Sequence, residues 1–204
     1  MSIALVKAIQ TKVGVTADGI FGPLTARKVA DALGVSPVGI QTAQFASGVL
    51  VTGKGKNIRR IAIHCTATRE GQDVDASTIK RWHLGQGWSD IGYHFVIRLD
   101  GTVERGRPEE VPGSHVRGFN AGSIAIVYVG GLDAQGKGKD TRTVQQKAAM
   151  LELVRGLLAK YPGADVLGHR DHSPDKDGDG VIERHEWLKE CPCFDVRAWW
   201  ESVR

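Results

Sequence analysis

From Arg59 to its end, the chain is divided into strands and helices by the spacing of its apolar residues. Residues 61–66 are apolar on both faces, which is typical of a strand in the middle of a covered sheet. Further strands are predicted by apolar runs at 92–97, 123–129 and 166–168, and by the hairpin signal Asp100-Gly101 before 102–104. Helices are predicted over 76–86, over an apolar stripe from Val144 to Leu158, and after an Asp195 N-cap. Strands that alternate with helices indicate an α/β domain with a mixed central sheet flanked by helices.

The amino-terminal quarter has only helical spacing. A first helix is predicted by Leu5, Ile9 and Val13, and a second by Leu24, Val29 and Leu33. We therefore predict a small all-α domain over residues 1–50. The polar stretch within 51–58 predicts a flexible linker, and 59–204 then forms the larger domain.

Composition narrows the possible partners and the cellular location. The net charge of +4 and a pI near 9.0 suit an anionic partner, such as a cell-wall polymer. The Lys and Arg residues are scattered, without a basic helix or an aromatic RNA-binding motif, which argues against nucleic acid. No apolar run approaches the roughly 18 residues of a membrane helix. The first residues lack the pattern of a signal peptide, so we expect synthesis in the cytoplasm.

Residue types that bind zinc occur at separate places in the chain. His64 lies in the first predicted strand of the larger domain, His169 follows the last one, and Cys191 lies further on. A catalytic zinc site uses three protein ligands, and zinc favours imidazole nitrogen and thiolate sulfur. An odd number of cysteines, three, argues against a disulfide framework and leaves a thiolate free for a metal.

Cys193 is an alternative to Cys191 as the third ligand. The residue before a proline favours extended backbone, so a helix that carries Trp187 and Leu188 should end before Cys191. If extended backbone continues, the side chains of Lys189, Cys191 and Cys193 point the same way. Geometry therefore leaves the choice of cysteine open. Cys65 faces away from His64 on its strand and is expected to be a small core residue.

The segment 175–186, DKDGDGVIERHE, matches the EF-hand calcium loop at every diagnostic position. An Asp/Gly-rich surface turn explains most of these residues but gives no reason for Ile182 or the final Glu186. Pro174 disfavours an incoming helix, so we expect a structural Ca²⁺ rather than a switching sensor. The expected ligands are Asp175, Asp177, Asp179, the Val181 carbonyl and Glu186, with Glu183 acting through a water.

Residues 17–25, ADGIFGPLT, provide a first family resemblance. They resemble the DGxFGPxT signature of the peptidoglycan-binding helical repeat found in many cell-wall hydrolases. The resemblance implies that the domain over residues 1–50 anchors the protein to the wall, with Asp18 and Phe21 as candidate contacts.

The larger domain resembles the zinc N-acetylmuramoyl-L-alanine amidases from about Ile61 to Trp200. The motifs, in order, are AIHCTAT at 62–68, WH at 82–83, QGW at 86–88, IGYHF at 91–95, GSH at 113–115 with Asn120, and KECPCFD at 189–195. The resemblance extends to the phage lysozymes of amidase type, which share a fold with animal peptidoglycan recognition proteins. The resemblance implies zinc bound by His64, His169 and Cys191, and catalytic roles for Tyr93 and Lys189. His115 and Asn120 are candidate substrate contacts.

The resemblance implies hydrolysis of the amide between N-acetylmuramic acid and L-alanine in peptidoglycan by a zinc-activated water. We expect a monomeric phage endolysin that reaches the wall, in the periplasm, after a separate protein permeabilises the membrane. One alternative is a bacterial wall-recycling amidase. The fused wall-binding repeat favours the endolysin over this alternative. Another is a recognition module that binds peptidoglycan without cleaving it. Such modules are marked by loss of the thiolate ligand, whereas this chain keeps a cysteine at position 191.

Overall fold

The computed structural model describes residues 2–15, 17, 25, 28–29, 32–33 and 57–204. Within them, five strands form one sheet in the order β4-β3-β5-β1-β7. All neighbours in this sheet are parallel except β3 and β4, which are antiparallel. The strands are β1 (Arg60–Cys65), β3 (Phe95–Ile97), β4 (Val103–Arg105), β5 (Ser123–Tyr128) and β7 (Asp165–Gly168). The mixed central sheet predicted from the sequence is thus confirmed.

The middle of the sheet is its most apolar part. β1 lies between β5 and β7, and Ile61, Ala62 and Ile63 are completely buried. A strand covered on both faces needs apolar residues at successive positions, and the sequence of β1 has them. Two shorter strands, β2 (Thr68–Arg69) and β6 (Gly131–Leu132), pair in parallel as a separate small sheet.

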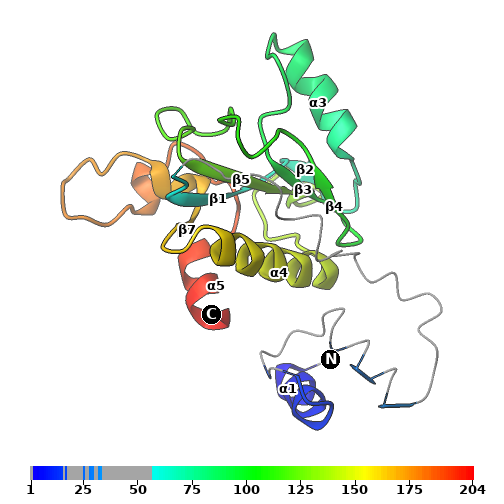
Figure 1. Ribbon diagram of the computed structural model, residues 1–204. Helices are drawn as coiled ribbons and strands as arrows, with labels where there is room; N and C mark the ends of the chain where they lie inside the picture. The colour runs from blue at the N-terminus through cyan, green and yellow to red at the C-terminus, as the bar shows by residue number, and fades with distance from the viewer. Residues whose placement is uncertain (1, 16, 18–24, 26–27, 30–31, 34–56) are drawn as a thin grey trace.

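Helices cover both faces of the sheet (Figure 1). Helices α4 (Val144–Lys160) and α5 (Val196–Val203) pack on one face, where apolar side chains from β1, β3 and β5 meet those of α4. Helix α3 (Ala76–Gly85) lies on the other face, where Ile79 belongs to a smaller apolar cluster with Val96 and Val127. His64 pairs in register with Val127 and therefore points to the α3 face.

Side-chain caps explain where the helices begin. Asp75 and Asp195 accept hydrogen bonds from the backbone N–H groups of Thr78 and Ala198, and the predicted Asp195 cap is confirmed. Thr143 and Gln146 form a capping box at the start of α4. The buried Gln146 amide also donates to the carbonyls of Ile97 and Val129, which ties this end of α4 to the sheet.

Several local predictions differ from the structure. The second predicted strand begins at Phe95 rather than residue 92, because the backbone groups of Gly92 and Tyr93 bond to the Ser114 and Arg107 loops instead. Val144, at the first turn of α4, is 60% exposed rather than part of the packed stripe. Trp187 and Leu188 are not helical. Only a short 3-10 turn, η2 (Arg184–Glu186), precedes them.

The first predicted helix of the amino-terminal region is present as α1 (Ile3–Lys12). Its buried apolar residue is Val6, whereas Leu5 is half exposed. Gln10 donates a hydrogen bond to the Thr25 hydroxyl at 3.2 Å. Residues 18–24 and 34–56 lie outside the described residues, and with them Asp18, Phe21 and most of the predicted linker. Among the described residues, no helix has both the length and the apolar character needed to cross a membrane.

Candidate metal centre

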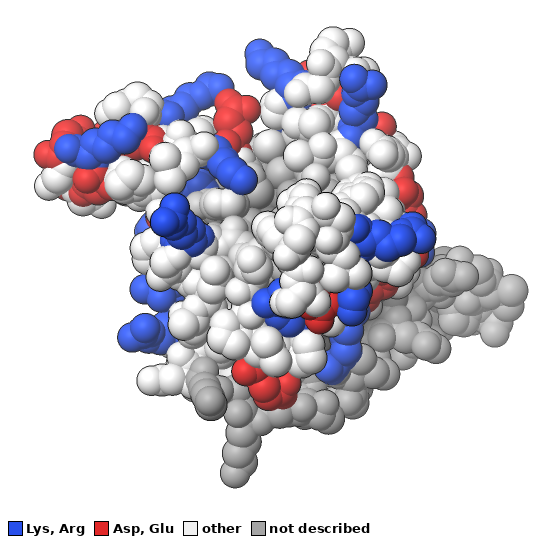
Figure 2. Space-filling view, turned by 90° about the horizontal axis from the view of Figure 1, so that it is seen from above, with Lys and Arg blue, Asp and Glu red and all other residues white. Residues whose placement is uncertain are grey.

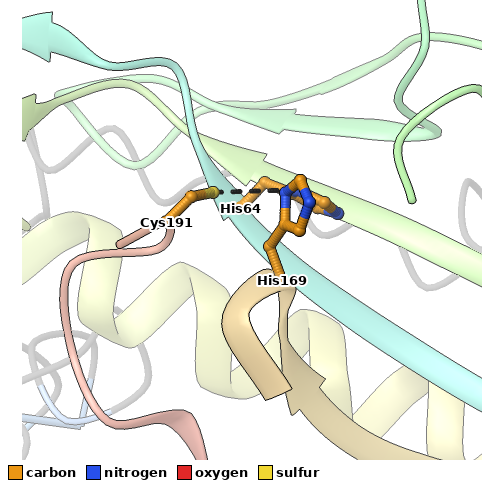
Figure 3. A group of neighbouring side chains, drawn as sticks. All are labelled: His64, His169 and Cys191. Atoms are coloured by element: carbon orange, nitrogen blue, oxygen red, sulfur yellow. Dashed lines mark hydrogen bonds between the residues drawn. The ribbon is translucent and has the colours of Figure 1, made fainter. Parts of the chain in front are cut away.

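The side chains of His64, His169 and Cys191 converge at one edge of the sheet (Figure 3). His64 is near the carboxyl end of β1, and His169 follows the last residue of β7. These strands are parallel neighbours with Ile63 opposite Gly168. The residues that follow, His64 and His169, therefore lie side by side. The two imidazole rings are 4.8 Å apart between centroids. Ligand sites in α/β sheets commonly lie at this carboxyl edge.

Backbone contacts bring Cys191 to the same edge. Its sulfur accepts a hydrogen bond from the Cys65 N–H at 3.3 Å, and its carbonyl accepts one from the Arg170 N–H at 2.9 Å. The next carbonyl, of Pro192, accepts a bond from the buried Tyr128 hydroxyl. Gly168 allows this approach, since a Cβ there would lie 2.8 Å from the Pro192 ring. The cysteine segment is therefore fixed to β1, β5 and the end of β7.

The donor set has the chemistry and spacing of a zinc site. One donor atom from each of the three side chains lies within 4.8 Å of the other two. The Cys191 Sγ is 3.8 Å from the His64 Nδ1. Bonds of about 2.3 Å to sulfur and about 2.0 Å to nitrogen, at a tetrahedral angle, would separate these atoms by about 3.5 Å. The residues present therefore fit a zinc ion.

Burial keeps the imidazoles neutral and able to bind a metal. It lowers the pKa of His64 well below the usual histidine value, and the neighbouring His115 and His169 lower it further. Burial and then the Lys189 ammonium lower the pKa of His169 to about 4. Both rings therefore have a free nitrogen lone pair at neutral pH, before any metal binds.

Cys193 lies apart from this group. Its backbone has a positive φ of 67°, so the extended geometry considered from the sequence does not continue past Pro192. Its sulfur lies 3.8 Å from that of Cys65, which is buried in the core cluster beneath β1. The structure thus places Cys191 beside the two histidines and Cys193 beside Cys65.

A groove of about 490 Å³ opens beside His169. Four of the residues singled out from the sequence line it: His115, Asn120, His169 and Lys189. Lys189 is exposed. Tyr93 is half-buried, with its ring 5.2 Å from that of His64. Burial, and then the nearby Cys191 thiol, raise the pKa of Tyr93, so its hydroxyl keeps its proton at neutral pH.

Comparison with known proteins places the chain in a family. Residues 54–186 match the family model of the N-acetylmuramoyl-L-alanine amidases, which is more than half of the chain. The chain belongs to this amidase family. It is 40% identical to the endolysin of Klebsiella phage KP32 over 149 residues, which covers 73% of this chain and 89% of that protein.

Solved structures agree with the fold. The amidase superimposes on the N-acetylmuramoyl-L-alanine amidase LysC of Clostridium intestinale with a TM-score of 0.55 and 30% identity, over 76% of this chain and 88% of that one. It also superimposes on the Drosophila peptidoglycan recognition protein LB with a TM-score of 0.51 and 24% identity, over 74% and 84% of the two chains. The second likeness concerns the fold alone, and it confirms the recognition-protein architecture expected from the sequence.

Trp88 and His172 also line the amidase groove. The sequence named Trp88 only within the QGW motif, without a role, and did not single out His172. His172 approaches the Gly168 carbonyl through Nδ1 at 3.0 Å, and its buried Nε2 has no hydrogen-bond partner among the described residues. The spacing of His172, three residues after His169, was the available signal. The tight turn η1 (His169–His172), which follows β7, is what gives this spacing a consequence, because both histidines line the groove.

The acidic loop of the amidase, 175–186, forms a lobe beside the groove. Figure 2 shows acidic and basic side chains together on this lobe, at the left of the view. Its possible metal-binding residues form two groups that share Asp177: one with Asp175 and Asp179, the other with Glu183, His185 and Glu186. The buried Glu186 carboxylate accepts hydrogen bonds from the Lys176 and Glu183 N–H groups, and the first of these contributes most to lowering its pKa.

Proposed function

We propose that this amidase is a zinc-dependent endolysin that hydrolyses the amide bond between N-acetylmuramic acid and L-alanine in peptidoglycan. The observation that carries the proposal is the convergence of His64, His169 and Cys191 at the carboxyl edge of β1 and β7. The family supplies the identity of the bond and of the substrate. The phage endolysin relative, matched over most of its length, favours wall lysis over wall recycling.

The three ligands would hold the metal beside the groove, which His169 lines. When bound, zinc lowers the pKa of a coordinated water to about 7 and polarises the scissile carbonyl. His64 lies on β1, His169 directly follows β7, and Cys191 lies on a loop tethered to both, so the geometry of the ligand group is restricted before substrate arrives. A recognition module without catalysis has no need of the Cys191 thiol, so this alternative is disfavoured.

Lys189 is proposed to stabilise the oxyanion that forms when the amide is attacked. It lines the same groove as His169, and its ammonium acts on the pKa of both histidine ligands, which places its charge close to the centre. A positive charge near a developing oxyanion stabilises the transition state more than the neutral ground-state carbonyl.

Tyr93 is proposed to orient the attacking water and to relay a proton. Its ring contacts His64, and the raised pKa of its phenol means that the group acts as a neutral hydrogen-bond donor and acceptor. The ring also lies 5.5 Å from that of His83, whose Nδ1 accepts a bond from the Gly92 N–H. His83 therefore supports the backbone directly before Tyr93.

The products of digestion test the proposed reaction. Purified peptidoglycan treated with the protein should release free stem peptides and leave intact glycan strands, as identified by mass spectrometry. Only cleavage of the bond between the lactyl group and L-alanine gives both products. Shortened glycan strands, or peptides cut internally, would show that another bond is hydrolysed.

We also propose that the 175–186 loop binds a structural Ca²⁺. Oxygen atoms of Asp175, Asp177 and Asp179 lie within 4.8 Å of one another. One buried oxygen of Glu183 has no hydrogen-bond partner within the part of the chain that the structure describes, and burial, with repulsion from Asp179 and Asp177, raises the pKa of that carboxyl. A cation would relieve this repulsion and would draw the two acidic groups that share Asp177 around one centre.

Calcium should stabilise the zinc-loaded protein. At a concentration one hundred times its Kd, a ligand that binds only the folded state adds about 2.7 kcal/mol to the free energy of unfolding. We expect the melting temperature to rise with millimolar CaCl₂ and to be unaffected by calcium in an Asp175→Ala variant, which lacks the carboxylate of the first loop position. Calorimetry on both proteins measures the binding directly. Absence of both heat and stabilisation in the wild-type protein would leave the loop as an acidic turn.

The amino-terminal region is proposed to anchor the protein to the cell wall. The support is the resemblance of residues 17–25 to a wall-binding repeat, since Asp18 and Phe21 lie outside the described residues. A variant lacking residues 1–50 should sediment poorly with insoluble peptidoglycan while cleaving a soluble muropeptide at nearly the wild-type rate. Equal sedimentation of the two proteins would assign wall binding to the amidase domain alone.

A further inference from the structure

The two ring nitrogens of His64 face different neighbours. Nδ1 lies 3.8 Å from the Cys191 sulfur, on the side of the ligand group. Nε2 lies 3.1 Å from the Nδ1 of His115, at hydrogen-bond distance, although the two residues are 51 positions apart. The rings meet edge-on, with an interplanar angle of 85° and centroids 5.0 Å apart. His64 thus has one nitrogen toward the candidate metal and the other toward a second imidazole.

The proton between the two rings decides whether His64 can bind a metal. A neutral imidazole has one protonated nitrogen and one with a free lone pair. If His64 Nε2 carries the proton and donates it to His115 Nδ1, the lone pair of His64 Nδ1 is available toward Cys191. If His115 donated instead, the His64 proton would sit on Nδ1 and would block coordination. Metal-binding histidines commonly donate their other N–H to a carboxylate, a backbone carbonyl or water; here the His115 imidazole lies in that position.

We propose that His115 is a positioning residue that accepts the His64 Nε2 proton and thereby commits His64 Nδ1 to the metal. This inference rests on the proposed function, because it concerns the affinity of the same zinc site. It gives His115 a role toward the metal ligand rather than the substrate contact expected from its motif. The ligand class is a divalent metal that prefers nitrogen and sulfur donors.

The loop that carries His115 is built to hold this ring in place. The Asn120 Oδ1 accepts hydrogen bonds from the N–H groups of both His115, at 2.8 Å, and Val116, at 3.0 Å. The Ser114 N–H donates to the Gly92 carbonyl, which joins the loop to the segment before Tyr93. At Gly113 a Cβ would lie 2.5 Å from the His115 ring, so only glycine leaves room for it. Asn120 therefore supports the proposed role indirectly, because it holds the backbone of His115 in place.

Two substitutions separate the acceptor from the shape of the side chain. His115→Leu removes the acceptor and keeps an apolar side chain of comparable bulk, whereas the Oδ1 of His115→Asn can replace the imidazole Nδ1. Zinc affinity is measured for both variants and the wild-type full chain by competition with a chromophoric chelator. The melting temperatures of the zinc-free proteins report on the fold, and Co²⁺ absorption spectra report on the ligand geometry.

We expect His115→Leu to bind zinc about 10- to 100-fold more weakly than the wild-type protein. His115→Asn should recover most of this loss, and the zinc-free melting temperatures of the two variants should be similar. Wild-type zinc affinity in His115→Leu would overturn the inference while leaving the proposed function intact. Equal losses in both variants, with lowered zinc-free melting temperatures, would show that His115 only supports the fold. A wild-type protein that binds no zinc would overturn both proposals.

Discussion

Replacing Cys191 with serine should abolish zinc binding and peptidoglycan hydrolysis together. The sulfur is one of three ligands, and serine at neutral pH offers a protonated hydroxyl in place of a thiolate. Two histidines alone should hold zinc at least about a hundredfold more weakly, a loss of about 2.7 kcal/mol in binding free energy. Hydrolysis should fall below detection at stoichiometric zinc, because the nucleophile depends on the metal.

Cys193→Ser is the matched control, since it makes the same chemical change two residues away. Its sulfur contacts Cys65 rather than the histidines, so zinc content and activity should remain close to wild type. Zinc content is measured by atomic emission after gel filtration, and activity by clearing of purified peptidoglycan. Stoichiometric zinc in the Cys191 variant, or its loss in the Cys193 variant, would reverse the assignment of the cysteines.

Lys189→Ala should lower kcat by about 10²- to 10³-fold, the usual effect of removing one group that stabilises an oxyanion. Zinc content and melting temperature should hardly change, because the side chain is exposed and no ion pair or hydrogen bond of it is found among the described residues. The loss should appear in kcat rather than in KM, since the charge acts mainly on the transition state.

Lys137→Ala removes the same charge from an exposed position on another loop, and it should leave kcat unchanged. Steady-state kinetics on a soluble muropeptide, with thermal melts of each variant, provide the comparison. A fall of several degrees in the melting temperature of Lys189→Ala, with kcat intact, would instead make Lys189 a structural residue of the loop before Cys191.

Predictions from the sequence succeeded where the signal was local. The buried strand β1 and the helix α4 follow from apolar spacing within six and seventeen residues respectively, and the Asp195 cap from the residue types around it. The prediction of a helix that carries Trp187 and Leu188 was wrong. That segment has too few turns for a helical period to be recognised, and the Glu183 N–H bonds to the Glu186 carboxylate there.

By itself, the sequence determined the α/β class, the kinds of ligand available and the family whose motifs surround them, since these depend on residue type and short-range spacing. Only the tertiary structure decided which atoms meet. His64 and His169 become neighbours through the parallel register of β1 and β7, and His115 reaches His64 across 51 positions. Cys191 and Cys193 are chemically identical and two residues apart. They are separated by a backbone turn and by contacts with Cys65, Arg170 and Tyr128, which come from distant parts of the chain.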